Sequence, residues 1–467
     1  MYNLPHLERN MFQQFIDILG ENGVIHGDEV KKRPADWVGS SNCNALAVLR
    51  PQNSDELSQI MKICHSENLK VVPAGGLTGL VHGTDCQNDE IQISFERMNK
   101  VISIDTVGKT MLVEAGCPLQ KIHEAANEHG LMYAIDLGAR GSCTIGGNIS
   151  TNAGGNQVIR YGMTREQVLG LEAVLADGTI VSSLNSLLKN NAGYDLKQLF
   201  IGTEGTLGLV TKAIIRLYPK PVSTNCALVA FDSFNQLTEF FGLVSNAFGG
   251  ALSSFEAMWG NHYELLTTRS NRHAPPIAIG APYYAIVETQ GFDEEKDSEN
   301  FNQVLENLIE NEKLIDATIC QNQTQREAIW KIREDIIGLY QLLAPLAIFD
   351  VSMPIVEMEN YDKNLKAAIK NEFGDAAEVI TWGHIGDCNL HIVVSPKVWN
   401  DDTHRKIEEH VYSPLKPLNG SISAEHGIGV EKRDFLWVSR NENEISLMRT
   451  LKSALDPKGI LNMGKVI

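Results

Sequence analysis

The stretch "GSCTIGGNISTNAGG", residues 141–155, decides the fold class because it sets small hydrogen-bonding side chains between glycines. Glycine adopts backbone conformations that are closed to other residues, so such a segment lets the backbone approach a ligand closely. The side chains that can donate a hydrogen bond here are Ser142, Thr144, Asn148, Ser150, Thr151 and Asn152. A small, uncharged, donor-rich segment is what a buried pyrophosphate or a flavin needs when the backbone does the binding.

A second glycine loop, "PAGGLTGL", spans residues 73–80 and follows the short apolar strand "LKVVP". Taken alone, this loop is more simply a tight turn. It is neither a GxGxxG motif that opens a helix nor a GxxxxGK(S/T) motif, so it supports neither a Rossmann dinucleotide site nor a P-loop. Two glycine loops in one region nevertheless favour a large phosphate-bearing cofactor.

The bulk properties exclude several kinds of protein. The chain has 467 residues and a net charge of −18, which argues against nucleic acid and anionic membrane surfaces as partners. Eight scattered cysteines without a CxxC pair predict reduced thiols in a cytoplasmic protein. The N-terminus lacks the apolar core of a signal peptide, and no run of about 18 apolar residues predicts a membrane span.

The order of apolar segments predicts three parts, at residues 1–221, 222–418 and 419–467. The first part contains strands near 91–95, 101–104 and 110–115 and a hairpin that turns at Asp177-Gly178, and Pro219 and Pro221 mark its end. In the second part, the strands "CALVAF", "YYAIVET", "LAIFDVSMP" and "AEVITWG" alternate with amphipathic stretches at 293–312 and 355–372, which is typical of an α+β unit. The third part ends in a helix and a short tail.

Two histidine-containing motifs form a candidate metal site. "GHIGDCNLH", residues 383–391, contains His384 and His391, and "SAEHGIG", residues 423–429, contains Glu425 and His426. Two imidazoles and one carboxylate suit Zn²⁺, with Mn²⁺ or Fe²⁺ as alternatives. The spacing is not HExxH, which excludes the helical site of a metalloprotease. From the residues alone the other reading stays open, namely two half-buried histidines at strand ends and a surface Glu-His.

Four long motifs carry a resemblance to a known family. "PAGGLTGL", "GSCTIGGNISTNAGGNQVIRYGMTREQVLGLEAVLADGTIV", "NNAGYDLKQLFIGTEGTLGLVTKAIIRLYP" and "LDPKGILNMGK" resemble the FAD-linked D-2-hydroxyacid dehydrogenases. These include D-lactate and D-2-hydroxyglutarate dehydrogenases, within the vanillyl-alcohol-oxidase-like flavoproteins, and the resemblance runs from about residue 40 to the C-terminus. It implies an α+β fold: a two-part PCMH-type FAD-binding domain, an inserted α+β substrate (cap) domain, and a C-terminal segment that returns to the flavin.

The resemblance also implies the residues that hold FAD. Superfamily members that bind flavin covalently use a His or Cys near the first glycine loop, and Pro73–Val81 has neither, so the FAD is expected to be non-covalent. The expected contacts are Pro73, Ala74, Gly75, Gly76, Leu77, Thr78, Gly79, Leu80, Ser142, Gly146, Gly147, Asn148, Thr151, Asn152, Gly154, Glu204, Val210 and Asn462.

For the chemistry, the resemblance implies that His384, His391 and Glu425 bind a divalent metal and that His426 contacts the substrate and acts as general base. Arg333 matches the arginine that binds the substrate carboxylate, a role that suits a two-pronged guanidinium. Hydride would leave C2 of the substrate for flavin N5, giving a 2-oxo acid. Cys388 stands where the family usually has glycine, which puts the conformation of the turn between the histidines in doubt.

The substrate side chain is predicted from three apolar positions. Ile337, Ile348 and Val393 stand where the 2-hydroxyglutarate enzymes of the family carry threonine, lysine and asparagine. An apolar pocket would disfavour a second carboxylate, so the sequence favours D-lactate or a D-2-hydroxy acid with a short apolar side chain. Alternatives are a D-2-hydroxyglutarate dehydrogenase, a non-catalytic FAD-binding subunit of an electron-transfer complex, and a metal-dependent hydrolase.

The sequence says less about the other partners of the protein. It has no cysteine-rich cluster motif and no nicotinamide fingerprint, so an electron-transfer flavoprotein or a quinone is the expected electron acceptor. The oligomeric state stays open, a homodimer included.

Overall fold

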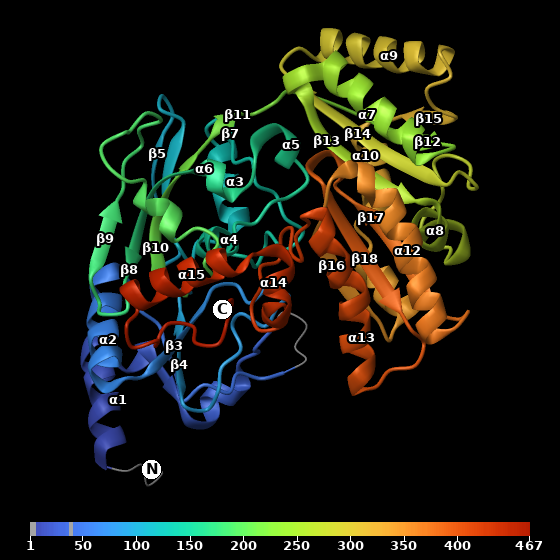
Figure 1. Ribbon diagram of the computed structural model, residues 1–467. Helices are drawn as coiled ribbons and strands as arrows, with labels where there is room; N and C mark the ends of the chain where they lie inside the picture. Colours follow the sequence, from blue (N-terminus) through green and yellow to red (C-terminus); the bar gives the residue numbers. More distant parts are fainter. Residues whose placement is uncertain (1–5, 37–40) are drawn as a thin grey trace. The chain divides into compact units, whose positions relative to one another are not determined.

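The computed structural model describes residues 6–36 and 41–467 and divides them into two compact units (Figure 1). The first unit holds the chain up to Gly155, Gly162–Lys220 and Glu425–Ile467, and the second holds Asn156–Tyr161 and Pro221–Ala424. The sequence places these boundaries at 222 and 419 and leaves 156–161 in the first part. Residues 156–161 join the second unit because Arg160 Nη1 donates to the carbonyl oxygens of Gln290, at 2.7 Å, and Ala251, at 3.3 Å.

The first unit begins with a small sheet in the order β1-β2-β4-β3, in which β2 and β3 run parallel to β4. Leu57, Ile60, Met61 and Cys64 give α2 a fully buried stripe, as their helical spacing predicts. The Asn53 side chain caps this helix by accepting a hydrogen bond from the Glu56 N–H. The elements are α1 (His6–Leu19), β1 (Val24–His26), β2 (Ala47–Leu49), α2 (Ser54–Glu67), β3 (Lys70–Ala74) and β4 (Glu90–Ser94).

A five-stranded antiparallel sheet in the order β5-β6-β10-β8-β9 completes the first unit and shares one hydrophobic core with the smaller sheet. The hairpin predicted at Asp177-Gly178 is confirmed, because β8 and β9 pair antiparallel on either side of it. The strands of this sheet are β5 (Val101–Asp105), β6 (Thr110–Glu114), β8 (Val168–Val174), β9 (Ile180–Ser183) and β10 (Leu209–Arg216). A separate two-stranded sheet pairs β7 (Leu131–Met132) with β11 (Tyr218–Pro219). The helices of this region are α3 (Leu119–Asn127), α4 (Ile145–Thr151) and α6 (Thr164–Gln167), while α5 (Val158–Tyr161) belongs to the second unit.

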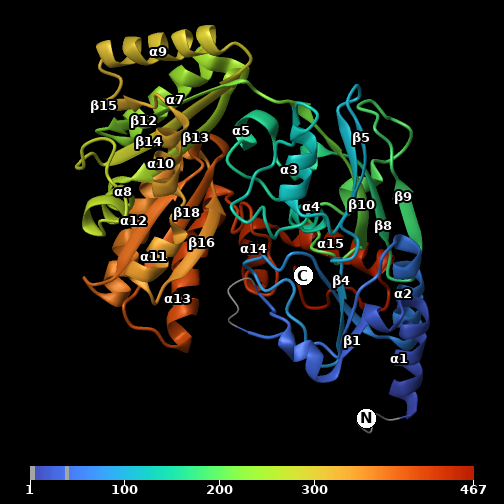
Figure 2. The same cartoon turned by 180° about the vertical axis from the view of Figure 1, so that it is seen from behind.

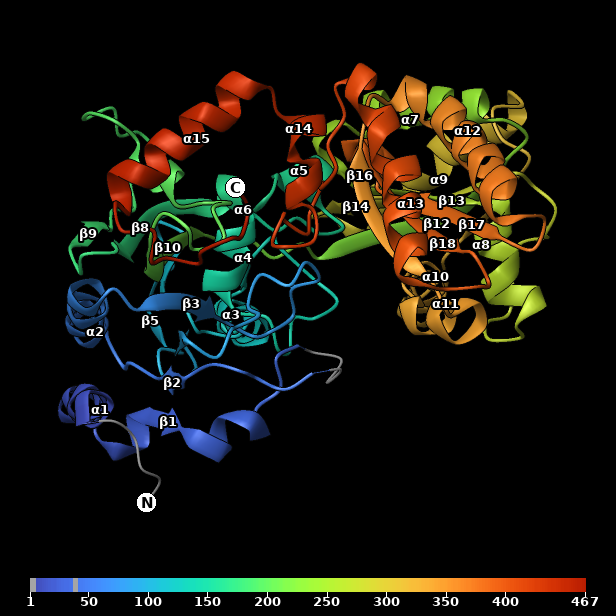
Figure 3. The same ribbon diagram turned by 60° about the horizontal axis from the view of Figure 1, so that its bottom comes forward.

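The C-terminal segment returns to the first unit at Glu425 and contains α14 (Leu436–Ser439) and α15 (Glu442–Leu455) (Figure 3). Its tail runs beside β3, where the Val71 N–H donates to the Ile460 carbonyl and the Asn462 N–H donates to the Val71 carbonyl, both at 2.7 Å. Asp456 fixes the preceding turn by accepting from the N–H groups of Ile460 and Leu461. The tail therefore brings Asn462 to the strand that leads into the first glycine loop.

The second unit is built on a seven-stranded antiparallel sheet in the order β15-β12-β14-β13-β17-β18-β16 (Figure 2). The four strands predicted from the sequence are confirmed as β12, β14, β16 and β17, and the two amphipathic stretches as α9 and α12. The strands are β12 (Ser223–Phe231), β13 (Leu252–Trp259), β14 (Tyr283–Gly291), β15 (Asp316–Ile319), β16 (Ala347–Ser352), β17 (Glu378–Gly383) and β18 (Asn389–Ser395). The helices are α7 (Phe234–Phe248), α8 (Gly260–Glu264), α9 (Glu294–Glu310), α10 (Gln323–Arg333), α11 (Ile336–Leu343), α12 (Ile355–Phe373) and α13 (Asp401–Tyr412).

The two faces of this sheet differ in chemistry. On one face, Phe240 of α7 packs against Phe231 and Phe255, with ring centroids 5.1 and 6.3 Å away. Side chains alternate between faces along a strand, so Glu256 lies on the face opposite its neighbour Phe255. Trp382 pairs with Met258 of β13 and with His391 of β18. Met258 lies two residues after Glu256 and so shares its face, which places Trp382 and His391 on the Glu256 face as well. Both faces of the sheet are therefore covered by hydrophobic side chains, and the Glu256 face also carries buried polar groups.

None of the helices in the described part of the chain is both long and apolar enough to cross a bilayer.

Candidate active site

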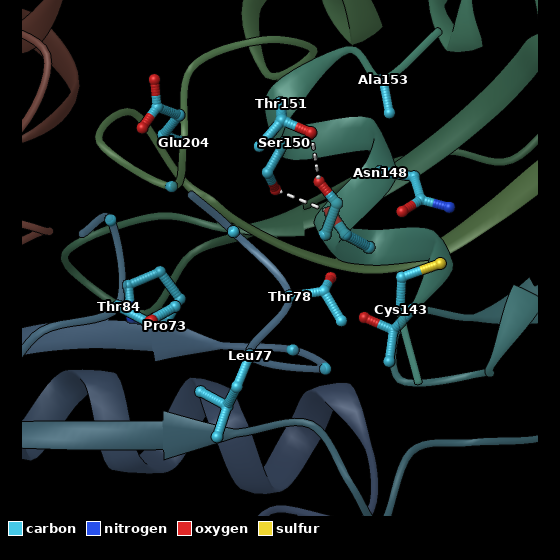
Figure 4. Close-up of a pocket in the computed structure, with 18 of the residues that line it drawn as sticks. Pro73, Leu77, Thr78, Thr84, Cys143, Asn148, Ser150, Thr151, Ala153 and Glu204 are labelled. Atoms are coloured by element: carbon cyan, nitrogen blue, oxygen red, sulfur yellow. Dashed lines mark hydrogen bonds between the residues drawn. The ribbon is translucent and has the colours of Figure 1, made fainter. Parts of the chain in front are cut away.

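Both glycine loops line one cavity of about 360 Å³ in the first unit (Figure 4). The first loop begins at the end of β3, and the second, residues 141–155, contains the short helix α4. The turn before β10, the Glu425-His426 pair and Asn462 complete the wall. Segments far apart in the sequence therefore meet at this cavity, as the two-part FAD-binding domain predicts.

Glycine is required where the two loops touch. A Cβ atom on Gly76 would lie 1.9 Å from the Ser142 carbonyl oxygen, and one on Gly75 would lie 2.5 Å from Thr144 Oγ1. A Cβ atom on Gly146 would lie 2.8 Å from the Ala115 carbonyl oxygen. The backbones can approach this closely only because these residues lack side chains.

The polar atoms of the wall fit an uncharged, hydrogen-bonding cradle for a cofactor. Ser150 Oγ and Thr151 Oγ1 donate to the carbonyls of Gly146 and Gly147, at 2.7 and 3.1 Å (Figure 4). Thr144 Oγ1 and Asn462 Oδ1 are buried and make no hydrogen bond within the described residues. Buried polar atoms are almost always satisfied, so these two atoms indicate a polar ligand at this wall, as the phosphate and flavin groups of FAD would provide.

Glu204 ties the loop that carries Glu425 and His426 to the cavity. Its Oε1 accepts from the Ile428 N–H at 2.6 Å and its Oε2 from the Gly429 N–H at 2.9 Å. Burial raises the pKa of Glu204, although the two N–H groups oppose this shift. Gly429 has φ +53° and lies so close to Val81 that a Cβ atom would meet the Val81 carbonyl oxygen at 1.9 Å. These contacts hold Glu425 and His426 at the wall of the cavity.

Most of the residues predicted to contact FAD line this cavity, and Ala74, Ser142 and Asn152 do not. Ala74 is buried within β3, and Ser142 presents its carbonyl oxygen to Gly76 rather than its hydroxyl to the cavity. Asn152 Oδ1 accepts from the Arg165 N–H at 2.9 Å, so its amide serves the chain itself. The lining residues among the predicted set are Pro73, Gly75, Gly76, Leu77, Thr78, Gly79, Leu80, Gly146, Gly147, Asn148, Thr151, Gly154, Glu204, Val210 and Asn462.

Sequence reasoning missed several other lining residues. Thr144 and Ser150 were among the possible donors of the glycine loop, although the contacts that the resemblance implied did not include them. Phe95 and Ala115 follow β4 and β6, and no local pattern distinguishes them from other residues at strand ends.

In the second unit, His384 and His391 come together as predicted. Their ring centroids are 5.1 Å apart and the rings are nearly perpendicular, at 75°. His384 follows β17 and His391 lies in β18, and both are buried. The turn between them closes through the Asn389 N–H, which donates to the His384 carbonyl oxygen at 3.1 Å. Gly383 permits this closure, because a Cβ atom there would lie 2.4 Å from the Asn389 carbonyl oxygen.

Cys388 adopts the left-handed conformation, with φ +71°. This is the conformation that glycine favours, and glycine is the usual family residue here. The turn therefore keeps the backbone path that glycine would allow, and the cysteine takes it with some strain.

Arg333 is not a solvated surface charge. It lies at the end of α10, is buried, and donates from Nε to Glu256 Oε2 at 2.9 Å. His384 Nδ1 is 2.6 Å from Glu256 Oε1, and His384 Nε2 is 3.0 Å from Arg333 Nη2. Burial disfavours the charged form of Glu256, but His384 and Arg333 outweigh it and lower the pKa of this carboxyl. Sequence reasoning missed Glu256, whose signal was a lone carboxylate inside the apolar run "ALSSFEAMW".

Two of the three predicted specificity residues lie side by side in the sheet, and the third lies on a helix surface. Ile348 and Val393 face each other across β16 and β18, and Val393 is fully buried. Ile337 is 63% exposed, and its place in the substrate pocket stays a prediction. Helix periodicity explains this exposure, because α11 buries Gly338, Leu339 and Leu343 and turns position 337 outward.

The predicted ligands and base are divided between the units. His384, His391 and Arg333 belong to the second unit, and Glu425 and His426 belong to the first.

Solved structures show the fold. The chain aligns with p-cresol methylhydroxylase at a TM-score of 0.77, with 16% identity, over 99% of this chain and 98% of that chain. It aligns with alkyldihydroxyacetonephosphate synthase at a TM-score of 0.75, with 16% identity, over 99% of this chain and 87% of that chain. The predicted PCMH-type α+β fold is therefore confirmed.

Family comparisons and relatives define the class. Residues 45–183 match the family described as "FAD binding domain", and residues 220–466 match "FAD linked oxidases, C-terminal domain". An Arabidopsis thaliana mitochondrial D-2-hydroxyglutarate dehydrogenase is 39% identical over 97% of this chain and 80% of its own length. A Xanthomonas citri D-2-hydroxyglutarate dehydrogenase is 38% identical over 96% of both chains. A Schizosaccharomyces pombe protein, provisionally named as a mitochondrial D-lactate dehydrogenase, is 34% identical over 96% of this chain and 88% of its own.

The fold and the cavity thus define a flavoprotein of the FAD-linked oxidase type. Within that class, the chain belongs to the FAD-linked D-2-hydroxyacid dehydrogenases, which are oxidoreductases that act on CH–OH groups.

Proposed function

We propose that the protein oxidises a D-2-hydroxy acid to the corresponding 2-oxo acid. The observation that carries this proposal is the cavity of the first unit, where the glycine loops meet the loop that presents His426. When bound, FAD supplies the acceptor for the hydride that leaves C2 of the substrate. His426 takes the proton of the substrate hydroxyl as general base, and Arg333 binds the substrate carboxylate.

We also propose a divalent metal, zinc before manganese or iron, on His384 and His391. The support is the convergence of two buried imidazoles, one of which is anchored at Nδ1 by a carboxylate, as metal-binding histidines usually are. Glu425 remains the third ligand predicted from the sequence. When bound, a divalent ion lowers the pKa of the substrate hydroxyl.

The side chain of the substrate has two candidates. Ile348 and Val393 pair in the second unit and favour D-lactate or a short apolar side chain. Relatives named D-2-hydroxyglutarate dehydrogenases favour the dicarboxylate.

A substrate panel separates the two candidates. We expect kcat/KM for D-lactate and D-2-hydroxyisovalerate to exceed that for D-2-hydroxyglutarate by roughly tenfold or more, because an unpaired buried carboxylate is costly. The double variant Val393→Asn with Ile348→Lys should move the preference toward the dicarboxylate. If the wild-type protein preferred D-2-hydroxyglutarate, a substrate with a short apolar side chain would be rejected, and the assignment as a D-2-hydroxyacid dehydrogenase would stand.

The electron acceptor and the cellular location are further parts of the proposal. We propose an electron-transfer flavoprotein or a quinone as electron acceptor. Activity with an artificial acceptor would reject the alternative of a non-catalytic FAD-binding subunit. The cytoplasmic location also remains a prediction, and several relatives carry mitochondrial names.

A further inference from the structure

Helix α10 sets two arginines against two buried glutamates on one face of the seven-stranded sheet. Arg326 donates from Nε and Nη2 to the two carboxylate oxygens of Glu288, at 2.5 and 2.9 Å. Arg333, seven residues later on the same helix, donates to Glu256. Glu288 lies on β14 and Glu256 on the adjacent β13. The two glutamates are equally buried, while the Arg326 side chain is 25% exposed and the Arg333 side chain 7%. Of the two glutamates, Glu256 is the one that contacts a histidine.

The neighbours of His384 determine which of its nitrogens carries the proton. A guanidinium only donates hydrogen bonds, so His384 Nε2, 3.0 Å from Arg333 Nη2, must be an acceptor. A carboxylate only accepts, so His384 Nδ1, 2.6 Å from Glu256 Oε1, must be the donor. Both contacts therefore require the neutral imidazole with its proton on Nδ1 and its lone pair on Nε2.

The same carboxylate also orients the guanidinium. Glu256 Oε2 lies 2.9 Å from both Nε and Nη2 of Arg333. Within the described residues, the third nitrogen, Nη1, makes no hydrogen bond. Glu256 thus engages one edge of the guanidinium and leaves the Nη1 side to another acceptor.

We propose that Glu256 is a positioning residue that prepares two groups at once. It keeps the His384 proton on Nδ1, so that Nε2 keeps its lone pair for a divalent cation that takes the place of the Arg333 Nη2–H contact. It also holds Arg333 through Nε, so that Nη1 meets the carboxylate of the hydroxy acid. This inference rests on the proposed function, since it assigns Glu256 a role toward the metal and the substrate of that site.

Glutamine in place of Glu256 cannot do both tasks. Its carbonyl oxygen can accept from only one of the two sides, and its NH₂ group must then face the other. If the oxygen serves His384, the NH₂ group faces the N–H groups of Arg333. If the oxygen serves Arg333, the NH₂ group donates to Nδ1 and moves the imidazole proton to Nε2, which removes the metal-binding lone pair.

The test compares Glu256→Gln with the matched variant Glu288→Gln in the full-length, FAD-loaded protein. Zinc affinity is measured by competition with a chromophoric chelator, after the metal has been stripped. We expect Glu256→Gln to bind zinc roughly 10- to 100-fold more weakly than wild type, as loss of a carboxylate behind a ligand histidine does. Glu288→Gln removes an equivalent buried charge and should keep wild-type zinc affinity within about twofold. KM for the hydroxy acid should rise in Glu256→Gln only.

The outcomes separate this inference from the function on which it rests. If wild type binds no zinc, the metal and the inference both fail. If wild type binds zinc and Glu256→Gln binds it equally well, only the inference fails. An equal loss in both variants would show general destabilisation and would also overturn it. Should Glu256→Gln fail to fold, Glu256→Asp gives the same readout, because it keeps the charge and is too short to reach both partners.

Discussion

Gly76→Ala is expected to release FAD from the protein. The new Cβ atom would lie 1.9 Å from the Ser142 carbonyl oxygen, so one glycine loop must move away from the other. The atoms nearest to the new Cβ atom belong to the backbone of Ser142 and Cys143, so no flexible side chain can move out of its way. Overpacking of this kind costs about 1–3 kcal/mol, which corresponds to roughly 5- to 150-fold weaker flavin binding. The flavin-to-protein absorbance ratio after dialysis measures the loss.

Gly141→Ala is the matched control for this prediction. Gly141 lies in the second glycine loop, has no atom within 4 Å of an added Cβ, and does not line the cavity. We expect this variant to keep wild-type flavin content and melting temperature. One FAD per chain in purified Gly76→Ala would show that the two loops do not form the cofactor cradle.

His426→Asn is expected to lower kcat by roughly 10²- to 10⁴-fold, the usual contribution of a general base. His426 lines the cavity on a loop that Glu204 fixes through two N–H groups, so its removal should leave the loop in place. Flavin content and melting temperature should therefore stay close to wild type. Steady-state rates with an artificial electron acceptor measure the effect.

His129→Asn serves as control, since His129 is an exposed residue of the same unit. Its kcat should match that of wild type. If kcat of His426→Asn also stayed within about threefold of wild type, another group would have to accept the hydroxyl proton.

Short sequence patterns predicted the elements whose structure depends on residues close together in the chain. The hairpin at Asp177-Gly178 and the strands of the second unit follow from alternating or continuous apolar runs, and the structure contains them. The two glycine loops line the cavity as expected, because glycines such as Gly75 and Gly76 let their backbones approach each other. His384 and His391 lie seven positions apart around a tight turn, so their convergence was also a local property.

The rest depends on contacts between distant residues. Glu256 meets Arg333 and His384, which are 77 and 128 positions away in the chain, so no sequence window contains both partners. Residues 156–161 join the second unit through Arg160, whose partner carbonyls at 251 and 290 are equally remote. The exposure of Ile337 also depends on the direction in which α11 turns it, which a position in the chain does not fix.

The most direct test of the central claim is anaerobic addition of D-2-hydroxy acids to the FAD-loaded protein. The account predicts that D-lactate or D-2-hydroxyisovalerate bleaches the flavin absorbance at about 450 nm, and that the L-enantiomers leave it unchanged. If only D-2-hydroxyglutarate bleached the flavin, the assigned substrate would be that dicarboxylate and the assigned reaction would stand. A flavin that no D-2-hydroxy acid reduces, or that L-enantiomers reduce equally fast, would contradict the account.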